Sequence, residues 1–463
     1  MTIVVPWLFS HDTSLVARGY YLSGQGNDSG DGSAAQPWRS LERLGRASLL
    51  PGDEVSFKRG STFNGGIEID QSGTEAAPII FGSYGSGAAP IFTNPKGETL
   101  DGNAIRVNAQ HVIVQQLSFR RCPADAQAID VRHLGAVFLT TNADHAIVRG
   151  CEMTDTPVGI TVYGQHDLII SNYIHDATKP VKPYWGPMGV VLCSSHDEIA
   201  HNRFVNYCAP SAEYGHDGGA IEINDRGLPK EDISIHHNLS LRNQGFIEWV
   251  GRVPPVDPRQ SSMASVPADA DGGSGPVIQS HFVIHHNVCM DYQSFLGLTG
   301  PCTDIRVENN TVIRTLAHEQ PDSEDVVFWE YFANHDIRFL NNIFVWDGRL
   351  VEGVYSRGHP YHDYNLYYRS DGANVPTAPN STAYQRRYLG GGAELSFAEK
   401  IGDPLFRDFK AGDFRLNPGS PAIAAGTVLH YDKDFAGNAI PTNRPPAIGA
   451  YETVEKPTLN GIR

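Results

Sequence analysis

The chain has 463 residues, a formal net charge of −16 and a sequence pI near 5.6. This acidic balance gives no support to a nucleic-acid partner, which would need a basic surface. With 47 glycines and 30 prolines, the composition predicts many turns and little helix, while a hydrophobic content of 40% is enough for a core. No stretch is apolar over the length that a membrane-spanning helix needs, so no membrane partner is expected.

The first sixty residues are predicted to close one end of the fold. The opening, MTIVVPWLFSHD, has a short apolar run without the basic residues of a signal peptide. As written, the chain is therefore expected to be cytoplasmic, or secreted or periplasmic if a signal has been removed. Residues 40–49 space Leu41, Leu44 and Leu49 at helical intervals and predict a capping helix.

Six scattered cysteines form no CxxC pair, so they indicate buried small side chains and no zinc site.

One pattern dominates the middle of the chain: alternating apolar residues, then asparagine, then another apolar pair. It is seen in DLIISNYIHD (167–176), EDISIHHNLSLRN (231–243) and TDIRVENNTVIRT (303–315). An alternation of two residues predicts strands, and its recurrence along the chain suits a solenoid of parallel strands. We expect the asparagines at turns that tolerate left-handed backbone, stacked from coil to coil. They are Asn172, Asn202, Asn238, Asn287, Asn310, Asn342 and Asn365.

Counting from these asparagines predicts a column of glutamates. Glu248 and Glu352 each stand ten residues after an asparagine of the repeat, and Glu222 and Glu330 stand twenty after one, which allows for a loop of ten. We expect Glu222 beside Glu248, and Glu330 beside Glu352, on the outer face, about 4.8 Å apart. Facing like charges are destabilising without a shared proton, a cation or a basic neighbour. By the same count the column also holds Leu192 and Gly297.

The stretch HDGGAIEIND (216–225) supports a functional role for this column. Strands disfavour glycine and aspartate, and a local rule broken in this way often marks a functional site. Asp217 lies on the loop that enters the strand of Glu222.

The repeat resembles the right-handed parallel β-helix proteins of the pectin-lyase-like superfamily. Residues 20–60 are similar to a capping region of bacterial members, and residues 403–426 with 445–452 are similar to their terminal coil. The resemblance implies an all-β, single-domain solenoid with an N-terminal cap helix and an irregular C-terminal coil. It also implies a polysaccharide as the usual substrate and allows a homo-oligomer, since trimers occur among similar proteins.

We therefore divide the chain into a capping segment (1–60), coils that carry the site (61–370), and a loop excursion with the C-terminal coil (371–463). Within the last part, ELSFAEK (394–400) is expected to add a short helical turn.

Hydrolysis of a glycosidic bond needs two carboxyl groups, one as acid and one as nucleophile or base. Asp217, Glu222 and Glu248 are the predicted catalytic residues of a glycoside hydrolase or transglycosylase. Glu222 and Glu248, one rung apart, lie near the separation of about 5–5.5 Å that suits retention, and Asp217 offers a longer one. Closeness would split the pKa values of the carboxyls and keep one protonated near neutral pH. No cofactor is required in this interpretation.

Aromatic and polar residues around the acids are predicted to bind the sugar. The set contains His216, Tyr184, Trp185, Trp249, Arg252, Trp329, Glu330 and Glu352. The excursion at residues 262–276 is a candidate lid or wall.

Two alternatives stay open. In a polysaccharide lyase, calcium held by the glutamates would neutralise a uronate, with Tyr184 or His216 as base and Arg252 as carboxylate clamp. The resemblance also includes non-enzymatic glycan-binding adhesins, whose glutamates would form a shallow ligand ladder.

Overall fold

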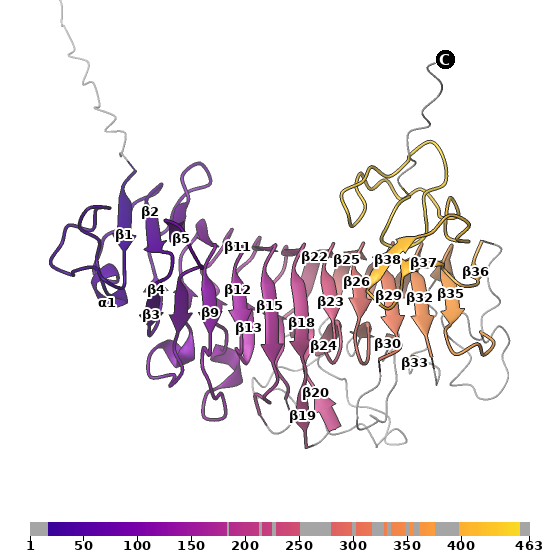
Figure 1. Cartoon of the computed structure of the whole chain (residues 1–463), viewed down its shortest axis with the longest axis horizontal. Coiled ribbons are helices and arrows are strands. Elements are labelled where there is room, and N and C mark those ends of the chain that lie inside the picture. Colours follow the sequence, from indigo (N-terminus) through magenta and orange to yellow (C-terminus); the bar gives the residue numbers. More distant parts are fainter. Residues whose placement is uncertain are drawn as a thin grey trace, which may run out of the picture.

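The computed structural model describes residues 17–182, 185–212, 215–224, 228–250, 279–298, 302–316, 328–330, 335–347, 352–354, 361–375 and 398–453. In these residues the chain winds through three parallel sheets in turn, so that each coil lies beside the next along one axis (Figure 1). The predicted parallel β-helix is confirmed.

Sheet A contains, in spatial order, β1 (Gly19–Leu22), β2 (Glu54–Lys58), β5 (Ile79–Tyr84), β8 (Val112–Gln115), β11 (Ile147–Arg149), β14 (Leu168–Ile170), β17 (Glu198–Ala200), β22 (Lys230–His236), β25 (Gln279–His285), β28 (Cys302–Glu308), β31 (His335–Leu340) and β34 (Tyr361–Asp363). Sheet B contains β3 (Thr62–Asn64), β6 (Ile91–Thr93), β9 (Ser118–Arg120), β12 (Glu152–Thr154), β15 (Tyr173–Ala177), β18 (Arg203–Tyr207), β23 (Leu239–Leu241), β26 (Val288–Met290), β29 (Thr311–Arg314), β32 (Ile343–Trp346), β35 (Leu366–Arg369) and β36 (Lys400–Ile401). Sheet C contains β4 (Ile67–Ile69), β7 (Ile105–Val107), β10 (Val137–Leu139), β13 (Val158–Val162), β16 (Met188–Leu192), β21 (Gly219–Asn224), β24 (Ile247–Val250), β27 (Leu296–Leu298), β30 (Phe328–Glu330) and β33 (Glu352–Val354).

Few elements lie outside these sheets in the described ranges. Two antiparallel pairs join β19 (Ala209–Ser211) to β20 (Gly215–Asp217) and β37 (Phe406–Asp408) to β38 (Asp413–Leu416). The helical segments are α1 (Leu41–Leu44) and the 3-10 turns η1 (Leu100–Gly102) and η2 (Val131–His133). No helix among the described residues has the length and apolarity to cross a membrane.

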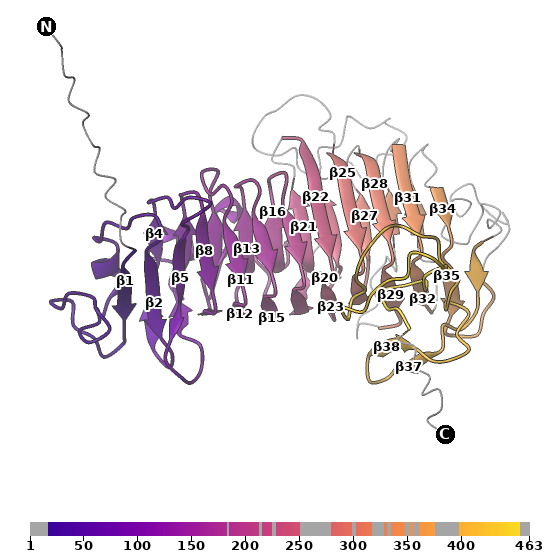
Figure 2. The same ribbon diagram turned by 90° about the horizontal axis from the view of Figure 1, so that it is seen from above.

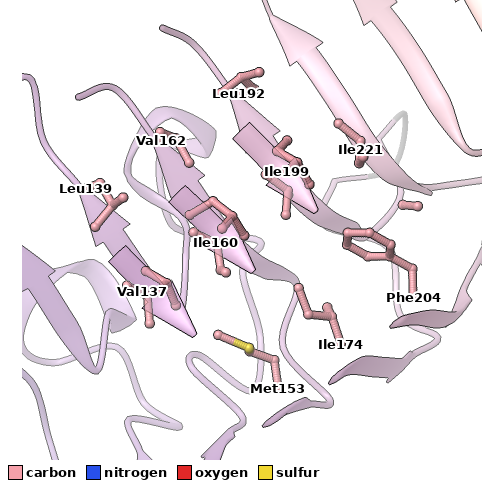
Figure 3. Close-up of a cluster of buried hydrophobic side chains, with 14 of the residues drawn as sticks. Val137, Leu139, Met153, Ile160, Val162, Ile174, Leu192, Ile199, Phe204 and Ile221 are labelled. Atoms are coloured by element: carbon pink, nitrogen blue, oxygen red, sulfur yellow. The ribbon is translucent and has the colours of Figure 1, made fainter. Parts of the chain in front are cut away.

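Alternate residues of all three sheets point inward and form a continuous apolar core. Figure 3 shows part of this core, where side chains of the same kind stack on successive rungs. Because a strand repeats every two residues, the residues between them point outward. The labelled side chains are Val137, Leu139, Met153, Ile160, Val162, Ile174, Leu192, Ile199, Phe204 and Ile221. The six cysteines lie in the described part of the chain and form no disulfide with one another; all are buried except the half-buried Cys208.

A ladder of asparagines runs along the turn between sheets A and B. The Asn202 backbone N–H and amide Nδ2 donate to Asn238 Oδ1 at 2.9 and 3.1 Å, and Nδ2 also donates to the Ile169 carbonyl at 2.8 Å. The same contacts recur from rung to rung, which confirms the predicted stacking. The left-handed residue, however, is the one before each asparagine, such as His201 with φ 54°. This places the amide inside the turn, where it binds backbone groups that water does not reach.

The ladder ends on a carboxylate. Glu399 Oε1 accepts hydrogen bonds from Asn365 Nδ2 at 3.2 Å, Tyr367 Oη at 2.7 Å and His362 Nδ1 at 2.7 Å, and its side chain is fully buried. The helical turn predicted at 394–400 is not found at its described end, because Lys400 already belongs to β36. Residues 394–397 lie outside the described ranges.

The C-terminal segment folds back over the outside of the stack and adds no further rung. Phe414, Leu416 and Ile448 pack on the outward side chains of sheet B, including Ile313 and Ile343. In Figure 2 this segment crosses β29, β32 and β35. The result is a second, smaller apolar cluster outside the core of the coils.

At the other end, the predicted capping helix is a single turn, α1. Ser40 accepts a hydrogen bond from the Arg43 backbone N–H as its N-cap, and Leu41, Leu44 and Leu49 are buried. The turn lies at the N-terminal end of the stack (Figure 1), beside β1 and β2. These two strands already belong to sheet A.

A shorter ladder of aspartates stabilises the turn into sheet A. Ala146 N–H donates to Asp167 Oδ1 at 2.6 Å, and Asp167 N–H donates to Asp197 Oδ1 at 2.8 Å. Burial raises the pKa of Asp197 to about 7, and burial together with the Asp197 charge holds the pKa of Asp167 well above its usual range. These carboxyls occupy positions that an amide could fill without a charge.

The asparagine ladder predicts a large loss of stability for Asn238→Ala. The substitution leaves two buried N–H donors of Asn202 and the Ile199 carbonyl without their partner. Each buried unsatisfied group costs about 1–3 kcal/mol, so the free energy of unfolding should fall by about 3 kcal/mol or more. Denaturant unfolding measures it, with Asn142→Ala on the exposed surface as the control. An equal effect of both substitutions would contradict the ladder.

The aspartate ladder predicts that Asp197→Asn stabilises the protein at alkaline pH. The folded state holds a proton that the unfolded chain releases near pH 4, so wild-type stability falls as the pH rises from 4 to about 7. The variant lacks this loss, so its free energy of unfolding at pH 8 should exceed that of wild type by a few kcal/mol, at about 1.4 kcal/mol per pKa unit of the shift. At pH 4 the two proteins should differ little. Unfolding midpoints at the two pH values test this, and Asp70→Asn on an exposed turn is the control.

Candidate functional site

Glu222 and Glu248 lie on adjacent rungs of sheet C. The register pairs Glu222 with Glu248 directly, as predicted from the asparagine spacing. Their strand neighbours Ile221, Ile223 and Ile247 are buried in the core, so both glutamate side chains leave the outer face of the sheet. Parallel strands lie about 4.8 Å apart, which brings two carboxyl groups into mutual range.

The loop before β16 covers Glu222. Trp185 Nε1 donates to Glu222 Oε2 at 2.6 Å, and Asn224 Nδ2 donates to Oε1 at 2.8 Å. Glu222 is consequently only 1% exposed although it points away from the core. Hydrogen bonds from N–H donors are stronger when the acceptor is ionised, so both donors favour the carboxylate form.

Asp217 is held at the same place by backbone groups. Its Oδ2 accepts from the Gly186 N–H at 2.9 Å and its Oδ1 from the Gly218 N–H at 2.7 Å. Gly186 packs so tightly that an added Cβ would lie 2.2 Å from the Asp217 carbonyl carbon. The backbone contact therefore fixes both Asp217 and the adjacent Trp185.

The three carboxyls interact electrostatically. Burial, the charge of Asp217 and the charge of Glu222, in that order, hold the pKa of Glu248 well above its usual range. Glu248 is half-buried, while Glu222 is buried. The cluster thus combines a carboxyl whose pKa is raised with two carboxyls whose oxygens accept hydrogen bonds from N–H donors, an arrangement suited to acid–base chemistry.

A calcium ion held by Asp217, Glu222 and Glu248 stays a prediction, since the clusters of potential ligand atoms among the described residues lie elsewhere. Carboxylate oxygens are the ligands that calcium prefers, and a cation would relieve their repulsion.

The second predicted pair of glutamates is wrong. Glu330 pairs with Leu298, and Glu352 pairs with Phe328, so the two are not opposite each other. Trp329 takes the register position of the Glu222–Glu248 column beside Gly297. The coil before the pair is also displaced, because Val191 and not Leu192 faces Glu222. A loop of unexpected length shifts the count by one residue and so changes which strand positions lie opposite each other.

Trp249 is not a sugar-binding residue. It is 1% exposed and packs in the core against Phe282, with ring centroids 4.3 Å apart. Its place next to Glu248 in the sequence puts it on the opposite face of the strand.

The remaining predicted residues are only partly covered by the structure. Trp185 contacts Glu222, and His216 is half-buried in β20 next to Asp217. Tyr184, Arg252 and the loop at 262–276 lie outside the described residues, and Trp329 is described by its backbone alone.

The lysines near the site have other partners. Lys182 Nζ donates to the carbonyls of Ala126, Gln127 and Ile129, and the buried Lys230 donates to the Leu228 carbonyl at 2.8 Å. Lys179 is exposed.

Two contributing residues were missed from the sequence. Asn224 stands two residues after Glu222 and so shares its face, a signal that strand alternation could have given. Gly186 gave no such signal, because its role depends on how a loop packs on another coil.

Solved structures share this architecture. Pectate lyase Pel9A superposes with a TM-score of 0.53 at 14% identity, over 94% of this chain and 96% of the lyase. The chain has the parallel β-helix fold.

Two further structures agree at the level of the fold. XylC, solved in complex with xylose, gives a TM-score of 0.51 at 10% identity over 95% of this chain and 99% of XylC. A double mutant of the tailspike protein of E. coli bacteriophage HK620 gives 0.50 at 12% identity over 76% of this chain and 60% of the tailspike. No protein-family model matches the sequence, and no curated protein matches it significantly.

The carboxyl cluster predicts that its charges set the pKa of Glu248. Removing a neighbouring charge in Asp217→Asn, or in Glu222→Gln, should lower the pKa of Glu248 toward its usual range. Carbon-13 NMR titration of labelled glutamate carboxyls measures it, with the signal assigned by its loss in Glu248→Gln. Glu68→Gln, an exposed glutamate of sheet C, should leave that titration unchanged. A wild-type Glu248 that titrates in the ordinary range would contradict the cluster.

Proposed function

We propose that this protein is a glycoside hydrolase, or a transglycosylase, that acts on a poly- or oligosaccharide at Asp217, Glu222 and Glu248. The substrate class is suggested by the fold, which is shared with a pectate lyase and with a protein solved with xylose. The reaction class is suggested by the carboxyl cluster. The single observation that carries the proposal is the pairing of Glu222 with Glu248 on adjacent rungs next to Asp217, and the raised pKa of Glu248 agrees with it.

Glu248 is the proposed general acid. A carboxyl group that remains protonated near neutral pH can give its proton to the glycosidic oxygen as the bond to the anomeric carbon breaks. Its half-buried position leaves part of the side chain accessible from outside the coil.

Asp217 is the proposed partner carboxylate. It either attacks the anomeric carbon or removes a proton from the attacking water, which leaves the stereochemical outcome open. Two backbone N–H groups orient it, and it is half-buried, so that one of its faces remains accessible.

Glu222 is proposed to position and tune the site. Both of its oxygens already accept hydrogen bonds, from Trp185 and Asn224, and the side chain is covered. Its charge supports the raised pKa of Glu248 across one rung.

A polysaccharide lyase is the second candidate, because three neighbouring carboxyls could bind calcium. Calcium would deprotonate Glu248 and neutralise a uronate, and His216 is the described candidate for the base. The adhesin alternative requires only binding and predicts no turnover.

The proposal predicts that Glu248→Gln and Asp217→Asn each lower turnover by ~10²–10⁴-fold, the contribution of a positioned acid or base. The assay is a panel of plant, algal and bacterial glycans, read both as new reducing ends and as ultraviolet absorbance of an unsaturated product. Glu68→Gln is the matched control, an exposed glutamate of the same sheet that should retain full activity.

The readouts separate the candidates. Reducing ends without the unsaturated product support the hydrolase. An unsaturated product that is lost with EDTA supports the lyase, and glycan binding without either product supports the adhesin. Full activity in both variants would remove these residues from the mechanism.

A further inference from the structure

A column of histidines runs along the turn that leads into sheet A, whereas Glu222 and Glu248 lie in sheet C. His111, His145, His166 and His196 stand on successive coils, each with a left-handed backbone of φ 52–63°. Their imidazole rings follow one another with centroids 4.9, 4.8 and 4.9 Å apart; the first pair is tilted and the other two are stacked. Histidine tolerates left-handed backbone better than most residues, which accounts for its use at this turn.

One coil of this column differs because an aspartate precedes its histidine. Asp144 Oδ1 lies 3.4 Å from His145 Nδ1 and 3.1 Å from His166 Nδ1. One ligand atom of each of the three side chains lies within 4.8 Å of the other two. A single carboxylate oxygen therefore stands between two imidazole nitrogens from adjacent rungs.

These separations match the edges of a metal-centred tetrahedron. Ligand bonds of about 2.0–2.1 Å place neighbouring donor atoms about 3.3 Å apart in a tetrahedral zinc site. Both distances from Asp144 are close to that value. The side chains are also accessible, with exposed fractions of 33% for Asp144, 50% for His145 and 47% for His166.

We propose that Asp144, His145 and His166 bind one divalent transition-metal ion, and that Zn²⁺ is the ion they suit best. Two imidazole nitrogens with one carboxylate oxygen form a borderline donor set, which favours zinc over the hard ions calcium and magnesium. Three protein ligands leave the fourth position to water or to an external ligand.

The surrounding coil holds the donors in place before an ion arrives. The His111 backbone N–H donates to the Asp144 carbonyl at 3.0 Å, and the His145 N–H donates to the Gln165 carbonyl at 2.9 Å. His196 stacks on the outer side of the His166 ring, and His111 packs at a tilt against the His145 ring. Rigid backbone reduces the entropy that binding must overcome.

A second histidine cluster of the described residues fits a metal less well. In the group of His201, His236 and His237, His236 Nδ1 lies 2.8 Å from His237 Nδ1, and His236 Nε2 lies 3.1 Å from Glu198. His237 Nε2 contacts the Asp434 carbonyl at 3.2 Å. Both nitrogens of His236 and His237 are thus engaged with protein partners.

The test is zinc titration of the full-length, EDTA-treated protein by calorimetry. Wild type should bind one equivalent of Zn²⁺ that depends on this trio, and His166→Gln or Asp144→Asn should weaken that binding at least ~10-fold. In Cu²⁺-loaded wild-type protein, electron paramagnetic resonance should show coupling to two imidazole nitrogens, reduced to one in His166→Gln.

The matched control is His281→Gln, an exposed histidine of β25 that lies beside Asp304 and leaves the trio and its ring contacts intact. Its zinc affinity should equal that of wild type, and unfolding midpoints without metal confirm that each variant is folded. The proposal fails if wild type binds no zinc, if His166→Gln binds it unchanged, or if His281→Gln loses it equally.

Discussion

The asparagine ladder is the contact on which the rest of the fold depends. Each buried amide receives two N–H groups from one coil and donates to the carbonyl of a strand, so neighbouring coils keep one register at this turn. Register decides which face each side chain takes, since a shift of one residue turns the whole strand over. The apolar core, the outward glutamates and the stacked histidines all follow from that one alignment.

Both sites described above use the same consequence of stacking. Residues far apart in the sequence come within about 5 Å when they occupy equivalent positions on neighbouring rungs. In the carboxyl cluster this concentrates negative charge and raises the pKa of Glu248. In the histidine column it aligns imidazole rings beside a single carboxylate. A solenoid thus builds polar clusters from short repeats, and the loops only decide what covers them.

The sequence predicted the coils and one carboxyl pair, because asparagine and apolar alternation are local signals with a fixed spacing. The count succeeded from Asn238 to Glu248, where no insertion lies between them. It failed for Glu330 and Glu352, since loop lengths between a turn and its next strand are not fixed by the repeat. The role of Gly186 could not be predicted from the sequence for a related reason: it depends on a close approach of two backbone segments. Asp144, His145 and His166 were not predicted as ligands, because their closeness depends on which turn positions align on neighbouring coils.

The side chain of Glu399 limits how far the asparagine ladder can extend along the coils. Each asparagine of the ladder accepts two N–H groups from the rung before it. It also donates its own backbone and amide N–H groups to the rung after it. The carboxyl side chain of Glu399 has no amide N–H, and it accepts hydrogen bonds from three side chains. It therefore ends the series of side-chain amides: a further coil, from this protein or from another copy, would not receive the side-chain N–H that each asparagine gives to the next rung.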